Sequence, residues 1–119
     1  MKQLEYTQRR STRMTITHAD AGSAIAIANF PVGTQVQVNF TTIEAFDNAN
    51  TLKVGTANDD TKFYTAKSVA TKTSETSHNL FVTTPSESEI VATVSGTATE
   101  GAVTITIDYT LPTSEEVSY

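Results

Sequence analysis

Two histidines are the side chains best suited to metal binding or proton transfer in this cysteine-free chain. His18 precedes Asp20 by two residues, and in an extended strand this spacing places both side chains on one face. A metal site or an acid–base pair there needs at least one more ligand nearby. We therefore expect His18 to form only a local hydrogen bond at a strand end. His78 lies in the polar stretch 71–78, which is predicted to be a loop, and is expected to be solvated.

Two clusters of Asp and Asn residues resemble calcium ligands in type. Asp47, Asn48 and Asn50 form the first cluster, and Asp59 and Asp60 form the second. Their spacing differs from the Asp-x-Asp-x-Asp-Gly loop that surrounds a calcium ion. Asp and Asn are also preferred in β-turns, because their side chains bond to the nearby backbone. The sequence therefore predicts turns at both clusters, and no metal or other cofactor.

The groups needed for covalent catalysis are largely missing from the sequence. Without cysteine there is no thiolate nucleophile, zinc knuckle or iron–sulfur cluster. No Gly-x-Ser-x-Gly elbow and no glycine-rich phosphate loop is present. There is no tryptophan either, so Tyr64 is the residue we expect to be available as a stacking platform for a sugar ring. We expect a protein that is not an enzyme.

The elements that would position these residues are predicted to be β-strands in one domain. A chain of 119 residues is one ordinary domain and can bury a core without staples. Threonine makes up roughly a fifth of the residues, and its branched side chain favours a pleated surface over a helix. No apolar run approaches the ~18–20 residues of a membrane span. The N-terminus has no hydrophobic stretch typical of a signal peptide, which predicts synthesis in a cytoplasm without export.

Strict alternation of apolar and polar residues is clearest in two segments, 34–43 and 102–111. Period two over this length predicts half-buried antiparallel strands. Shorter segments between turn signals raise the total to about eight strands, the spacing expected of a sandwich or barrel. We predict an all-β, antiparallel β-sandwich of jelly-roll type, with other sandwich orders left open. The shorter predicted strands are 14–18, 23–30, 51–54, 62–69, 79–83 and 88–95.

The charges divide the chain into three parts. Residues 1–13 are predicted to be an extended basic arm, with four cations against one acid. Residues 14–111 form the sandwich, and residues 112–119 form a short acidic tail. Beyond the arm, four lysines face twelve acids, within a net charge of −5 for the whole chain. Such an acidic body argues against nucleic acid as the ligand, because binding phosphates requires a basic surface.

The basic arm is the part of the chain that most suggests a partner. Arg9, Arg10 and Arg13 can each form forked hydrogen bonds to carboxylates. We expect them to bind a neighbouring protein or the acidic body of another copy. The alternative is that the arm is a leader without a role.

One stretch resembles a known group of proteins. Residues 36–47, Val-Gln-Val-Asn-Phe-Thr-Thr-Ile-Glu-Ala-Phe-Asp, are followed at 51–56 by Thr-Leu-Lys-Val-Gly-Thr. This pattern is similar to small β-sandwich structural proteins of tailed bacteriophage virions, in which a strand leads into an Ala-Phe-Asp turn and a Leu-x-Val-Gly strand. The resemblance covers most of residues 22–111. It implies a head decoration (cement) protein or a tail or fibre domain, and it supplies no functional residues.

The resemblance also implies partners and a location. A decoration protein binds and bridges major capsid protein subunits, and it stabilises the shell by mass action on the assembled state. We expect such a role here, on the capsid surface of a virion, with the protein made in the host cytoplasm. The partners would be the major capsid protein or other virion proteins, with a homotrimer as the expected oligomer and neither nucleic acid nor membrane. The alternative is a receptor- or carbohydrate-binding sandwich of a phage tail, fibre or cell-surface protein.

Overall fold

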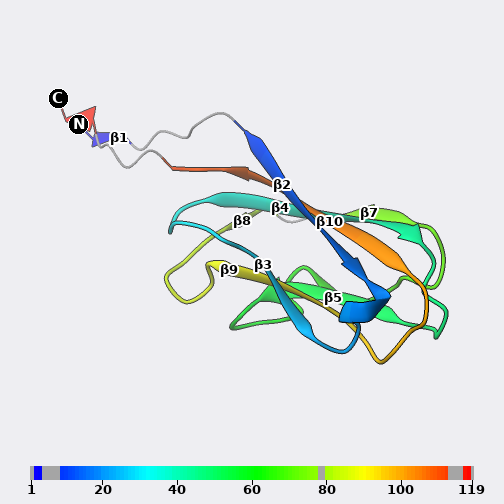
Figure 1. Cartoon of the computed structure of the whole chain (residues 1–119). Coiled ribbons are helices and arrows are strands. Elements are labelled where there is room, and N and C mark those ends of the chain that lie inside the picture. Colours follow the sequence, from blue (N-terminus) through cyan, green and yellow to red (C-terminus); the bar gives the residue numbers. More distant parts are fainter. Residues whose placement is uncertain (1, 4–8, 78–79, 113–116, 119) are drawn as a thin grey trace.

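The protein is a sandwich of two antiparallel β-sheets packed face to face (Figure 1). The computed structural model describes residues 2–3, 9–77, 80–112 and 117–118. Within these residues the only helical element is a short 3-10 turn, η1 (His18–Asp20), so no helix there could cross a membrane. The predicted all-β antiparallel sandwich is confirmed.

The first sheet contains the two strands with the clearest alternation, side by side at its centre. Its order is β2-β10-β4-β7, and β8 pairs with β4 on the same side as β7. The strands are β2 (Arg10–Thr17), β10 (Ala102–Thr110), β4 (Gln35–Glu44), β7 (Ser74–Thr76) and β8 (Phe81–Val82).

The second sheet is built from the segments that lie between those strands in the sequence. Its order is β3-β9-β5-β6, with every neighbouring pair antiparallel. The strands are β3 (Ala24–Asn29), β9 (Glu89–Val94), β5 (Thr51–Thr56) and β6 (Tyr64–Ser68).

The core lies between the sheets and follows the predicted alternation. On each inner strand every second side chain is buried, because successive residues of a strand point to opposite faces. Burying one such aliphatic side chain contributes about 1.5–3 kcal/mol, so the four inner strands supply most of the hydrophobic stabilisation. The buried sets are Val36, Val38 and Phe40 of β4, Val103, Ile105 and Ile107 of β10, Leu52 and Val54 of β5, and Ile90, Ala92 and Val94 of β9.

Two strands differ from the sequence prediction. β2 begins at Arg10, four residues before the apolar alternation starts at Met14, because β10 is long enough to pair with residues 10–13 as well. β7 lies in the stretch 71–78 that was predicted to be a loop. It contains no apolar residue, and backbone pairing with β4 holds it in place.

The two ends of the chain pair with each other beyond one end of the sandwich (Figure 1). β1 (Lys2–Gln3) is antiparallel to β11 (Val117–Ser118). Part of the expected arm therefore pairs with part of the expected tail of the same chain. Residues 4–8 and 113–116 between these strands and the sandwich lie outside the described residues.

Candidate interaction surface

The outer face of the first sheet consists almost entirely of hydroxyl and amide side chains. The core-facing residues of β4 and β10 are mostly buried, as is Ile16 of β2, so the alternate residues of these three strands point outward. Cross-strand neighbours interact there, as in the 3.0 Å hydrogen bond between the Thr15 and Thr104 hydroxyls. We call this surface the polar face: Ser11, Arg13 and Thr15 of β2, Thr104, Thr106, Asp108 and Thr110 of β10, and Gln35, Gln37, Asn39 and Thr41 of β4.

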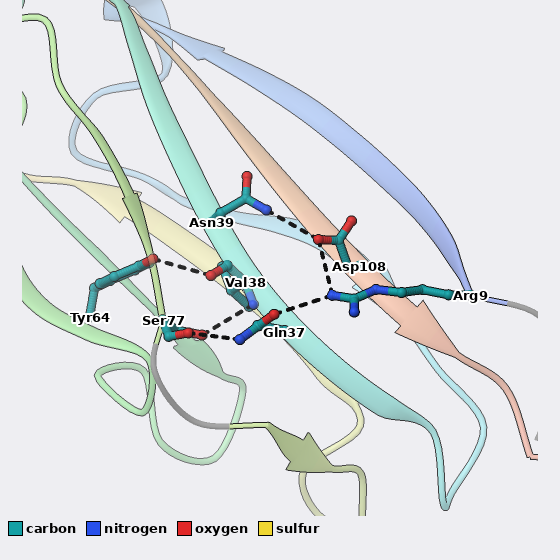
Figure 2. A network of polar contacts seen from close by, with 7 residues as sticks. All are labelled: Arg9, Gln37, Val38, Asn39, Tyr64, Ser77 and Asp108. Carbon is teal, nitrogen blue, oxygen red and sulfur yellow. Dashed lines mark hydrogen bonds and ion pairs between the residues drawn. The ribbon is translucent and has the colours of Figure 1, made fainter.

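A hydrogen-bond network holds Arg9 on the polar face (Figure 2). Its guanidinium donates to Gln37 Oε1 at 3.2 Å and to Asp108 Oδ2 at 3.4 Å. Asn39 donates to the same carboxylate at 3.5 Å, and Gln37 Nε2 donates to the Ser77 carbonyl at 3.1 Å. The Arg9 side chain is 60% exposed, and such ion pairs contribute at most about 1 kcal/mol. The first of the three predicted partner-binding arginines therefore binds its own sheet.

The other two predicted arginines, Arg10 and Arg13, lie exposed on the edge strand β2. Neither side chain forms a hydrogen bond or ion pair within the part of the chain that the structure describes. Three lysines behave differently and are neutralised by neighbouring acids. These pairs are Lys53–Asp60 at 2.7 Å, Lys62–Glu87 at 3.2 Å and Lys67–Glu75 at 3.4 Å.

Tyr64 is a core residue, so its predicted role as an exposed sugar platform is wrong. Its side chain is 5% exposed, and its ring meets Phe40 edge-on with centroids 5.1 Å apart. Its hydroxyl donates to the carbonyls of Val38 at 3.2 Å and Glu75 at 3.0 Å. Burial, with a smaller effect of the Glu75 charge, raises the pKa of Tyr64 well above its usual value. Because Phe63 and Tyr64 are adjacent where the short edge strand β6 begins, the sequence could not tell which ring faces the core.

The first Asp/Asn cluster stabilises turns, as predicted. Asp47 accepts hydrogen bonds from the Thr99 hydroxyl and from the Thr99 backbone N–H at 2.9 Å, and these bonds lower the pKa of Asp47. Asn50 accepts from the Asn48 backbone N–H at 3.1 Å and donates to the Ser95 carbonyl at 2.5 Å. These side chains thus tie two loops together at one end of the sandwich.

The side chains of the second cluster, Asp59 and Asp60, also bond to residues nearby in the sequence. Asp59 accepts from the Thr61 backbone N–H at 3.3 Å, and Asp60 forms the ion pair with Lys53. In the described residues no three His, Asp or Glu side chains come together as a metal-binding group.

His18 and Asp20 do not form a pair. Asp20 instead accepts a hydrogen bond from the Thr17 backbone N–H at 3.2 Å and so caps η1, while His18 is exposed. His78 lies outside the described residues.

A groove of about 180 Å³ lies beside Tyr64, between β6 and β7. It is smaller than the ~300–1,000 Å³ of usual small-molecule sites. Both of its lysines are already paired with acids, so neither is available to an anionic ligand. The residues that line it are Lys62, Phe63, Tyr64, Lys67, Glu75, Thr76 and Ser77.

Comparison with known proteins places this fold among phage capsid structures. No family model and no curated protein sequence matches the chain. A chain in the acid-stable capsid structure of Helicobacter pylori bacteriophage KHP30 superposes with a TM-score of 0.75 at 18% identity, covering 100% of both chains. A chain in the capsid asymmetric unit of cyanophage Pam1 superposes with a TM-score of 0.60 at 27% identity, covering 93% of this chain and 85% of that one. The predicted resemblance to phage virion structural proteins is thus confirmed.

Proposed function

We propose that this chain is a non-enzymatic virion structural protein that decorates a capsid. In this role it binds major capsid protein subunits at the shell surface, bridges them and stabilises the assembled shell. The observation that carries the proposal is the shared sandwich, at 27% identity over 93% of this chain, with a chain of a cyanophage capsid asymmetric unit.

The strand order supports a jelly-roll assignment. The first long strand, β2, lies beside the last, β10, and β3 lies beside β9 in the opposite sheet. The first strand of each sheet thus pairs with the last strand of the same sheet, and the chain crosses between the sheets. Two antiparallel sheets of four strand positions each, connected in this way, are the pattern of an eight-stranded jelly roll. Viral capsid domains are among the proteins that use this architecture.

The polar face suits adhesion better than catalysis. Short Thr, Ser and Asn side chains lose less rotamer freedom on docking than long charged ones. Each hydroxyl can both donate and accept a hydrogen bond, so it can pair with either a donor or an acceptor group on the partner protein. A shell that repeats this contact many times is stabilised by mass action even when each contact is modest.

The carbohydrate-binding alternative loses the residue on which it rested. Tyr64 is buried, and Tyr109 packs against Phe30 with ring centroids 4.8 Å apart. In the described residues, therefore, neither tyrosine presents a free ring as Tyr64 was expected to do.

The test is co-sedimentation of the purified protein with capsids built from the major capsid protein of the same genome. We expect saturable binding at a fixed ratio to the capsid protein, and shells that open at a higher temperature when the protein is bound. A protein that stays in the supernatant at all ratios contradicts the proposal. Sedimentation equilibrium tests the expected trimer, which would have three times the 12.8 kDa mass of the chain.

A further inference from the structure

The edge of β2 differs from every other sheet edge in the described residues. β2 pairs with β10 over eight residues without a register shift. The edge strands β3 and β6 both have register shifts against their neighbours, and β7 and β8 are only three and two residues long. Charged side chains, which β2 has in Arg10 and Arg13, are one means by which proteins prevent an extra strand from pairing at an edge, and bulges and short strands are two further means. β2 has neither of these two.

The phase of the hydrogen bonds identifies which β2 groups face outward from this edge. The His18 N–H donates to the Gly101 carbonyl at 3.0 Å, so even-numbered residues of β2 exchange bonds with β10. In an antiparallel pair the residues between them point their N–H and C=O away from the neighbour. The Thr17 N–H, which points this way, is capped by Asp20. The backbone groups of Ser11, Arg13 and Thr15 point the same way and have no partner in the described chain.

The two unpaired arginines flank this edge. Arg10 and Arg13 are three positions apart on one strand, so their side chains lie on opposite faces of the sheet. A second β2 strand would bring like charges to this edge, which disfavours pairing between copies. A strand with carboxylates on its two faces could instead form hydrogen bonds to the open backbone and ion pairs with both arginines.

We propose that the open edge of β2 accepts an extended acidic segment of a capsid protein as an added strand. This inference rests on the proposed function and specifies the chemistry of the contact. Backbone hydrogen bonds to Ser11, Arg13 and Thr15 supply the pairing, and Arg10 and Arg13 select an acidic sequence. Strand addition at a sheet edge is a general mode of peptide recognition.

The test compares Thr15→Pro with Thr15→Val in the capsid co-sedimentation experiment. Proline removes the outward N–H and is tolerated on the open side of an edge strand, whereas valine keeps this N–H. Both variants lose the hydroxyl bond to Thr104, so they form a matched pair. We expect Thr15→Pro to bind about tenfold more weakly or worse, the effect of a hydrogen bond lost at the interface, and Thr15→Val to bind like the wild type. Equal binding by the proline and valine variants overturns the inference.

A second variant guards against a proline effect on folding. If Thr15→Pro melts well below Thr15→Val, the double variant Arg10→Glu, Arg13→Glu decides, since it changes only exposed side chains. We expect this double variant to lose binding to capsids at moderate salt. In the wild type, we expect the backbone amides of residues 11, 13 and 15 to exchange hydrogen more slowly when the protein is bound to capsids. Unchanged binding of the double variant contradicts the inference. A wild-type protein that fails to sediment with capsids overturns the proposed function and, with it, this contact.

A contact between copies would give a different result. If the wild-type protein forms a concentration-dependent oligomer that Thr15→Pro abolishes, the occupant of the edge is a second copy. That outcome overturns the assignment to an acidic capsid segment.

Discussion

The neighbouring strands β10 and β2 share a sheet but differ in how many strands they pair with and in how many side chains they bury. β10 has a neighbour on both sides, and its Val103, Ile105 and Ile107 side chains are fully buried. β2 has one neighbour and contributes a single fully buried side chain, Ile16. The contrast indicates that the inner strands determine the stability of the sandwich. The outward backbone groups of Ser11, Arg13 and Thr15 on the edge strand have no partner in the described chain, and it is there that we propose a capsid segment pairs.

The largest expected effect comes from truncating a core side chain of β10. Ile105→Ala should lower the free energy of unfolding by about 2–5 kcal/mol, because it leaves a cavity between the sheets. Ile105→Val, the matched smaller truncation, should cost about 0.5–1.5 kcal/mol. Urea denaturation monitored by circular dichroism measures both. If Ile105→Ala lowers the free energy of unfolding no more than Ile105→Val does, the claim that the inner strand β10 determines stability is wrong.

A smaller loss is expected at the contact between β6 and the first sheet. Tyr64→Phe keeps the ring on Phe40 but removes the hydroxyl bonds to Val38 and Glu75. The loss should be about 1 kcal/mol at pH 7, measured by the same urea denaturation.

The same variant tests the pH dependence. Burial raises the pKa of Tyr64 in the folded state, so the unfolded chain loses this proton first, near the ordinary tyrosine pKa of about 10. The stability due to the neutral hydroxyl is therefore complete below about pH 10 and declines as the pH rises toward the folded-state pKa. Tyr64→Phe should decline less steeply than the wild type between pH 9 and about 11. Parallel curves would contradict the burial of an un-ionised hydroxyl.

A gain in stability is expected at one position of the inner strand β4. Among the described residues, the buried hydroxyl of Thr42 has no hydrogen-bond partner. Thr42→Val replaces this hydroxyl with a methyl group of similar size and should raise the free energy of unfolding by about 1 kcal/mol. Thr56→Val is the control, because the buried Thr56 hydroxyl donates to Glu87, and it should lower stability instead. A loss at Thr42 as large as that at Thr56 would show that Thr42 has a polar partner.

The smallest effect on stability is expected on β2 itself. Arg13→Ala removes an exposed side chain with no partner in the described chain and should change the free energy of unfolding by less than about 0.5 kcal/mol. Thermal melting of Arg13→Ala beside the wild type measures this difference. A destabilisation above about 1 kcal/mol would mean that Arg13 supports the fold and is not held free for a partner.

The fold was predictable where the residue pattern reflects burial. β4, β9 and β10 alternate strictly because one face of each is buried and the other is not. β7 gave no such signal, since all three of its residues are exposed and only its backbone pairing defines it.

The surface was less predictable, because it depends on contacts between residues far apart in the chain. Arg9 was recognised as a carboxylate-binding residue, but its partner Asp108 is 99 positions away, and only the sheet order brings them together. The open edge of β2 follows from strand order and register in the same way. In contrast, the bond from the Asn48 backbone N–H to the Asn50 side chain is local, so this turn could be read from residue type. The bond of Asp47 to Thr99 joins residues 52 positions apart and could not.

The most direct test of the central claim is a cryo-electron microscopy map of virions from the genome that encodes this chain. We predict density for the two-sheet sandwich on the capsid surface, with the β2 edge against an extended segment of a capsid protein. A map in which other chains account for all capsid density, with no copy of this sandwich, would contradict a capsid-decorating role.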